Sequence, residues 1–296
     1  MIKKFFIIIL SFSICNILNA DAFRIYFEND FPFDDDSDYT NGARFEYQYG
    51  KFNIFFEQLM YSPENIKTTK YILGSHPYAG FLGIGSGYTY DRVLSQKLFQ
   101  LNYFELSTGI VGPSSLAEET QKTIHKIIGA HEPKGWDNQL KDEFEIQGVV
   151  WSGYEYILFG KMSGFNLSIS DEIGGYFGTM QRAVGNNAYL KLRYGIGSNL
   201  DRRPSTIEIR SVNKFSAFIL VGNETRYWEH NVFLDGNRNK KSYSVEKEKW
   251  TTGIKTGIGV EYKCLEIGWF VLFNSREYKT QEHTPNYMSF QLGYKF

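Results

Sequence analysis

Two stretches of the sequence carry side chains that could catalyse hydrolysis. The first, HKIIGAHEPKGWDNQL, runs from His125 to Leu140 and opens with a histidine far from either end of the chain. A neutral imidazole can act as a general base near pH 7. The same spacing also suits a solvated histidine on an ordinary loop helix, so the role of His125 depends on where the fold places it.

The second stretch, FENDFPFDDDSDYTNG from Phe27 to Gly42, is rich in side-chain oxygens. Asn29 and Asp30 close a predicted strand, and such oxygens are hard ligands that suit Ca²⁺. Aspartates recur at every second position further on, but Tyr39 occupies the place where an EF-hand loop requires glycine. The EF-hand is therefore excluded, and the acidic run is interpreted as a solvated loop.

Alternation of apolar and polar residues predicts β-strands along most of the chain. For example, Leu190, Leu192 and Tyr194 alternate with Lys191 and Arg193. Aromatic residues make up 17% of the chain, although the mean hydropathy is only −0.35. An apolar outer face, a polar lumen and aromatic girdles are typical of a transmembrane β-barrel. A soluble β-sandwich shares the alternation and is the alternative.

The predicted fold class is all-β, a transmembrane antiparallel barrel of about twelve strands, because closed bacterial barrels have an even number. We predict strands at about 21–30, 41–49, 51–60, 77–91, 96–111, 143–159, 163–173, 185–198, 214–229, 250–262, 263–276 and 285–296.

Both ends of the chain indicate the outer membrane of a Gram-negative bacterium. The last segment, 288–296, alternates strictly and ends on Phe296, and it resembles the terminal strand of outer-membrane barrels. Residues 1–20 join two lysines to an apolar run too short to span a bilayer, which predicts a signal peptide before one barrel domain, 21–296. Removal of that peptide leaves Cys264 alone, so no internal disulfide can form. The net charge of −1 does not favour nucleic acid as a partner, and we expect a monomer.

Strand parity assigns the connections to the two sides of the membrane. Starting from the periplasm, it places 30–40, 61–76 and 112–142 outside, and makes Tyr49–Lys51 a tight inner turn. The polar segment 230–249 is predicted to be another external loop.

The loop 112–142 is predicted to contain a short helix over about 115–128. Ser115 and Glu118 have the spacing of a capping box, and Gly129 can end the helix. An apolar stripe of three isoleucines, one of them Ile124, predicts that the helix docks through that stripe, with His125 at its edge.

Four blocks of sequence, in order, resemble the lipid A 3′-O-deacylase family (LpxR-like). They are FEND…DYTNG.RFEY (27–47), EQLMYSPENI (57–66), HPYAGFL (76–82) and GIVGPSSLAEETQKTIHKIIGAHEPKGWDNQL (109–140). The blocks cover about the first half of the mature chain, and the later strands match only as a generic barrel.

This resemblance implies a twelve-stranded outer-membrane barrel that removes the 3′-linked acyloxyacyl chain from lipid A of lipopolysaccharide, with its active site facing the outer leaflet. It implies that His125 activates water as a general base and that Thr40 belongs to the same catalytic cluster. A Ca²⁺ ion near Asn29 and Asp30 would stabilise the oxyanion. Because water is the nucleophile and no serine is needed, no acyl-enzyme is expected.

One position departs from the family pattern. A glutamate directly follows the IIGA segment in the family, whereas His131 stands there in this chain and Glu132 follows it. Glu132 can serve as a metal ligand if the loop shifts by one residue. The phosphate-contacting lysine of the family corresponds to either Lys67 or Lys70, which could equally be ordinary loop lysines.

Two other functions stay open. One is a Ca²⁺-dependent outer-membrane phospholipase, although the chain has no G-x-S-x-G elbow to mark a nucleophilic serine. The other is a non-catalytic porin or surface-interaction barrel.

Overall fold

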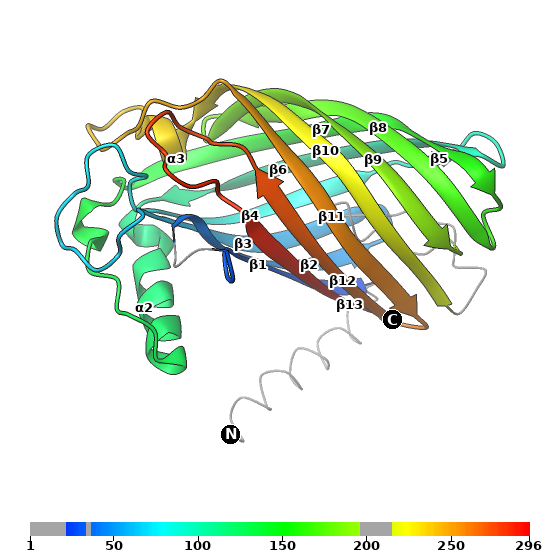
Figure 1. The fold of residues 1–296 in the computed structure, drawn as a ribbon, viewed down its shortest axis with the longest axis horizontal. Coiled ribbons are helices and arrows are strands. Elements are labelled where there is room, and N and C mark those ends of the chain that lie inside the picture. The colour runs from blue at the N-terminus through cyan, green and yellow to red at the C-terminus, as the bar shows by residue number, and fades with distance from the viewer. Residues whose placement is uncertain (1–21, 34–36, 196–214) are drawn as a thin grey trace.

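The alternating segments form the wall of a closed antiparallel barrel (Figure 1). The computed structural model describes residues 22–33, 37–195 and 215–296, so the predicted signal peptide lies outside the described residues. The strands are β1 (Ala22–Asn29), β2 (Asp38–Tyr49), β3 (Phe52–Ser62), β4 (Ala79–Thr89), β5 (Arg92–Val93), β6 (Leu98–Val111), β7 (Glu143–Gly160), β8 (Phe165–Gly178), β9 (Gln181–Tyr194), β10 (Phe215–Asn231), β11 (Trp250–Tyr262), β12 (Leu265–Asn274) and β13 (Tyr287–Lys295).

Each long strand pairs with its neighbours in the sequence, and two further pairings complete the ring. The first strand pairs with the last, β1 with β13, and β4 pairs with β6. The two-residue β5 pairs only with β6, on the connection between β4 and β6. Twelve strands therefore make the wall, which confirms the predicted count, and closure leaves no exposed sheet edge.

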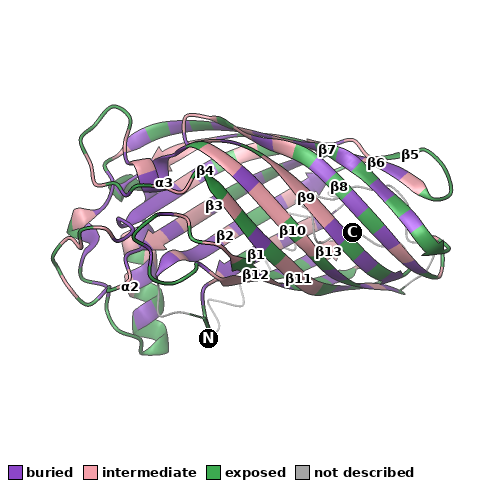
Figure 2. Cartoon of the chain, turned by 45° about the horizontal axis from the view of Figure 1, so that its top comes forward, coloured by how far each residue is buried: buried purple, intermediate pink, exposed green. Residues whose placement is uncertain are grey.

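Buried and exposed residues alternate along the strands (Figure 2). Phe45 and Leu192 face outward and are 45% and 52% exposed, whereas Arg44 and Lys191 face inward and are buried. An apolar exterior around a charged interior is the reverse of a soluble barrel and suits a lipid environment. The prediction of a membrane barrel is therefore confirmed over the described strands.

The inward-facing charges pair with one another, including between strands that are not adjacent in the barrel wall. Arg24 of β1 donates to Glu266 of β12 at 2.7 Å, and Arg44 of β2 donates to Glu105 of β6 at 2.9 Å. Glu46, also on β2, lies within 3.4 Å of both guanidinium groups. Buried charges of this kind are tolerated because each has an opposite charge beside it.

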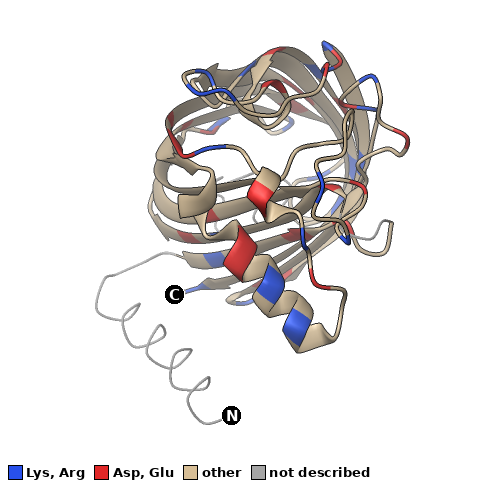
Figure 3. Ribbon diagram, turned by 90° about the vertical axis from the view of Figure 1, so that its left-hand side faces the viewer, with Lys and Arg blue, Asp and Glu red and all other residues tan. Residues whose placement is uncertain are grey.

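The helices gather at one end of the barrel (Figures 1 and 3). They are η1 (Pro113–Ser115), α2 (Ala117–Ile128), η2 (Trp136–Asn138) and α3 (Val232–Asp235). At the other end, β2 and β3 are joined by a two-residue turn in which Gly50 has a φ of 56°. No helix among the described residues is long and apolar enough to cross a membrane.

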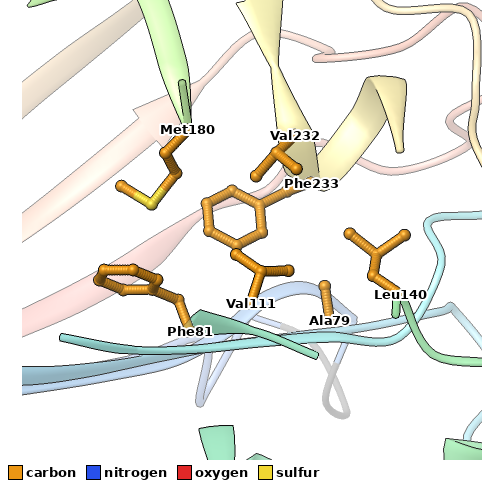
Figure 4. Packing of buried hydrophobic residues seen from close by; sticks show 7 residues of the cluster. All are labelled: Ala79, Phe81, Val111, Leu140, Met180, Val232 and Phe233. Atoms are coloured by element: carbon orange, nitrogen blue, oxygen red, sulfur yellow. The ribbon is translucent and has the colours of Figure 1, made fainter. Parts of the chain in front are cut away.

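A hydrophobic cluster crosses the lumen at the end that carries the helices (Figure 4). The segment 230–249, predicted to be a polar external loop, begins with α3, which buries Val232 and Phe233 inside the barrel mouth. Their partners come from both sides of the lumen and are Ala79, Phe81, Val111, Leu140 and Met180. The sequence prediction missed this plug because its apolar part is only three residues long.

Candidate active site

The helix α2 begins on the outer surface of the barrel wall. Gly80 of β4 lies on the outward face, because it has the same parity as Ile84, which is 60% exposed. A Cβ on Gly80 would lie 2.1 Å from Ser115 Oγ and 2.3 Å from Ala117 Cβ. Only glycine at this position lets the η1–α2 junction lie directly against the strand.

The start of α2 differs from the sequence prediction. The helix begins at Ala117, its N-cap residue is Leu116 in the left-handed conformation (φ 58°), and no side chain caps it. Ser115 belongs to η1, and its hydroxyl is buried without a hydrogen-bond partner, so the predicted capping box is wrong. The predicted end is confirmed, because Gly129 (φ 76°) closes the helix.

Helix α2 docks through a face on which two of the three buried side chains are polar. Its buried residues are Ala117, Gln121 and His125, which follow one another at intervals of four. The Gln121 side chain donates to Ser62 Oγ on β3 at 3.1 Å and accepts from the Trp136 indole at 2.8 Å. The predicted docking by isoleucines is wrong, because Ile124, Ile127 and Ile128 are all exposed.

The contacts of α2 define its course over the wall. Ala117 lies on Gly80 of β4, and one turn later Gln121 reaches Ser62, at the outer end of β3. Four residues of helix advance about 6 Å, slightly more than the spacing of adjacent strands. Because Ser62 pairs with Asp38 of β2, a further turn on this course leads His125 toward the β1–β2 connection.

His125 is 4% exposed and is oriented by the loop that follows the helix. Its Nδ1 hydrogen-bonds to the backbone carbonyl oxygen of His131. A carbonyl can only accept, so Nδ1 carries the proton and Nε2 is the basic nitrogen of the neutral ring. His131, the residue at the family's glutamate position, thus acts on His125 through its backbone.

The β1–β2 connection brings Asn29, Asp30 and Thr40 together. Asn29 Nδ2 donates to the Thr40 carbonyl at 2.9 Å, and the Asp30 amide lies 3.4 Å from the same oxygen. The Asp30 carboxylate accepts from the Ser37 amide at 2.9 Å. The pairing of β2 with β3 shifts register at Thr40, between Tyr39 and Asn41, which brings the Thr40 side chain to a buried position.

The residues present fit an oxygen-ligated cation only in part. Asp30 and Thr40 are both buried, and Thr40 Oγ1 has no hydrogen-bond partner, so an added ligand would satisfy it. A carboxylate and a hydroxyl oxygen are hard donors of the kind that Ca²⁺ binds. Across the described residues, however, no group of three His, Cys, Asp or Glu side chains is arranged to hold a metal ion. Glu132 is exposed on the loop after α2.

The two candidate lysines are both exposed on the β3–β4 connection. The Lys67 amide donates to the Asn65 side chain and the Lys70 amide to the Thr68 hydroxyl. Their ammonium groups face solvent, so the structure does not distinguish one from the other as a phosphate ligand.

Gln121 is a site residue that the sequence analysis missed. It connects α2 to the wall and to Trp136, and thereby fixes the helix turn on which His125 lies. The available signal was its position four residues before His125, because residues at this interval share a helix face.

One family model and several solved structures are similar to this chain. The family model described as "Outer membrane protein LpxR" matches residues 5–296. Among solved structures, LpxR from Salmonella typhimurium is similar with a TM-score of 0.78 at 19% identity, covering 93% of this chain and 100% of the other. The β-domain of the Bordetella autotransporter BrkA is similar with a TM-score of 0.48 at 8% identity, covering 94% and 99%.

No curated protein matches the chain. The family model spans nearly the whole sequence, and the Salmonella structure shares the complete barrel. This chain therefore belongs to the LpxR family of outer-membrane proteins.

Proposed function

We propose that this outer-membrane protein is a lipid A 3′-O-deacylase, which hydrolyses the 3′-linked acyloxyacyl ester of lipid A in the outer leaflet. The observation that carries the proposal is the placement of His125, a buried imidazole on a helix that lies on the outside of the barrel wall. A lipid reaches this surface by lateral diffusion, without entering the lumen.

In the proposed reaction, His125 Nε2 accepts a proton from the attacking water, while the His131 carbonyl holds the Nδ1 proton. The water oxygen forms a bond to the ester carbonyl carbon, and the bond to the sugar oxygen breaks with transfer of a proton to that oxygen. The products are a fatty acid and a free hydroxyl on the sugar. No serine nucleophile takes part in this scheme.

Asp30 and Thr40 are the residues that would hold Ca²⁺, with Asn29 fixing the Thr40 backbone between the two strands. When bound, Ca²⁺ would stabilise the negative charge that develops on the ester oxygen. Glu132 would need to turn inward from its exposed position to take part. Lys67 and Lys70, at the same end of the barrel, are candidates to bind the phosphates of lipid A.

The plug favours the enzyme over the porin alternative. Val232 and Phe233 are fully buried in a cluster that crosses the barrel mouth, so a solute would have to displace it to pass. The phospholipase alternative uses the same His125 geometry and differs only in the ester that reaches it.

The test is mass spectrometry of lipids from cells that produce the wild-type protein or the His125→Ala variant, with Ca²⁺ supplied and then chelated. We expect loss of the 3′ acyloxyacyl mass from lipid A only with the wild-type protein and Ca²⁺. The heat-modifiable mobility of the folded barrel on gels controls for assembly. Unchanged lipid A beside an assembled barrel would refute the proposal, and cleaved phospholipids in the same extracts would favour the phospholipase.

A further inference from the structure

One flank of α2 is apolar although no described part of the protein covers it. We define this apolar flank as Leu116, Thr120, Ile124, Ile127 and Ile128. Leu116 is 53% exposed, and Ile127 and Ile128 are each 69% exposed. The spacing of three and four residues places these side chains on one side of the helix, next to its buried face. A contiguous exposed apolar group of this kind marks a surface that contacts a partner or a membrane.

The opposite flank of α2 carries charged residues, and Figure 3 shows acidic and basic positions along the helix. Lys122 Nζ lies 2.6 Å from the Glu118 carboxylate. The hydrogen bond to Glu118 raises the pKa of Lys122, and the charges of Glu132 and Asp137 in the loop raise it further. The loop also bonds the buried face, because His125 meets the His131 carbonyl and Gln121 meets the Trp136 indole. Gln121 and His125 each lie three residues after a member of the Glu118–Lys122 pair, so the loop residues 131–137 lie beside the buried face, on the side toward the charged flank.

That loop lies beyond the ends of the wall strands. The Lys134 amide donates to the Ile66 carbonyl at 2.8 Å, and Gly135 packs on the Tyr78 ring. Ile66 follows the end of β3, and Tyr78 precedes the start of β4. Since the charged flank is turned toward these loop residues, the apolar flank is turned the other way, along the wall.

The wall on that side is the lipid-facing surface of the barrel. Gly80 of β4 is covered by Ala117. The next outward positions along β4, further from the helix end of the barrel, are Leu82 and Ile84, and Ile84 is 60% exposed. On β3 the outward Phe56 is 46% exposed. The apolar flank of α2 is thus continuous with a surface that acyl chains already cover in an outer-membrane barrel.

We propose that α2 is a membrane-contact helix, whose apolar flank lies among the acyl chains of the outer leaflet while Lys122 and Lys126 lie at the level of the lipid headgroups. The helix then has three surroundings: protein on its buried face, hydrocarbon on the apolar flank, and headgroups and water on the charged flank. This contact fixes the depth of His125 relative to the leaflet, and it does not depend on whether the protein cleaves lipid A.

The test measures the surroundings of single side chains in the barrel chain 21–296, which lacks Cys15, reconstituted in vesicles of phosphatidylethanolamine and phosphatidylglycerol. In a Cys264→Ser background, a nitroxide label is attached to Ile127→Cys and, as the matched control, to Lys126→Cys on the charged flank. A label at Ile84→Cys on the outer wall gives the value for full lipid exposure. Collision with oxygen, which partitions into lipid, is compared with collision with a water-soluble nickel complex.

We expect the label at residue 127 to resemble the label at residue 84, with collisions with nickel several-fold fewer than at residue 126. Equal nickel access at residues 126 and 127 would overturn the proposal. If the Ile127→Cys barrel does not fold, Ile128→Cys gives the same comparison. An inactive enzyme whose residue 127 is still shielded would refute the proposed catalytic function and leave the membrane contact standing.

Discussion

Replacing Gly80 with alanine should lift α2 from the barrel wall and lower the rate of lipid A deacylation. The added Cβ would lie 2.1 Å from Ser115 Oγ and 2.3 Å from Ala117 Cβ, whereas ordinary contacts begin at 3.4 Å. The η1–α2 junction would therefore retreat by about 1 Å, because a packed interface has no space to absorb the methyl group. His125 lies on the same helix and moves with it.

The expected effect is large on activity and small on stability. A displacement of about 1 Å between a catalytic group and its substrate can lower the rate by roughly 10²-fold. Overpacking of one methyl group costs about 1–3 kcal/mol, which leaves the barrel able to assemble. The two quantities are measured separately, as initial rates on purified lipid A and as urea unfolding followed by tryptophan fluorescence.

Gly164, in the turn between β7 and β8, provides the matched control. A Cβ at this position meets nothing within 4 Å, so Gly164→Ala should keep the wild-type rate. Adding Ser115→Ala and Ala117→Gly to Gly80→Ala removes both colliding atoms and should restore much of the activity. A wild-type rate for Gly80→Ala alone would refute the argument that docking of α2 positions the base.

Three further predictions concern the cation site, a buried histidine and the lumen. Asp30→Asn should raise the Ca²⁺ concentration needed for half-maximal activity more than Glu132→Gln does, because only Asp30 is buried beside Thr40. A larger effect of Glu132→Gln in a Ca²⁺ titration would indicate that the loop after α2 holds the cation instead. Burial lowers the pKa of His76 to about 4, so the unfolded chain binds a proton first and stability is lost as the pH falls from about 6.5 to 4. His76→Phe should remove up to about 3 kcal/mol of that dependence in urea unfolding, and an unchanged pH profile would contradict it. Arg24→Met removes the closest cation from buried Glu266, which keeps Lys295 at 3.0 Å. The barrel should therefore be destabilised, but by less than the roughly 3–5 kcal/mol of a fully uncompensated charge, whereas the exposed variant Lys70→Met should have little effect on urea unfolding.

The wall could be predicted from the sequence because side-chain parity in a strand allows only two faces. Arg193 and Lys191 had to face the lumen once Leu192 was assigned to lipid, and the burial of each side chain confirms this. The strand count followed from the same alternation. The two-residue β5 was missed because it is too short to show any alternation.

The helix α2 shows what periodicity cannot decide. The spacing of Ile124 and Ile127 correctly places them on one side of a helix, but a pattern does not state which side meets the protein. In a soluble loop the apolar side docks by default. Here a glutamine that bonds Ser62 and an indole supplies the docking contacts. These partners lie about 60 and 15 residues away in the chain, so no local pattern reports them.

The capping box failed for a related reason. Serine followed by glutamate three residues later favours a helix start. In the structure, however, the N-cap residue is Leu116 in a left-handed conformation, and the Ser115 hydroxyl makes no capping hydrogen bond. The close approach to Gly80 determines this geometry, because it demands a sharp turn between η1 and α2 directly on the strand. A tertiary contact thus overrides a local propensity at the junction that sets the position of His125.

The route to the site follows from two apolar surfaces that face in opposite directions. Inside the mouth, Phe233 and Phe81 belong to one buried cluster that crosses the lumen, whereas α2 lies on the outside of the wall, so the interior does not lead to His125. Outside, the apolar flank of α2 continues the lipid-facing wall, so a molecule dissolved in the leaflet can reach the helix by lateral movement alone. A lipid ester is already dissolved in the hydrocarbon next to this flank, whereas a water-soluble ester is not. The placement of the imidazole therefore favours a membrane lipid as the substrate class, independently of the family to which the chain belongs.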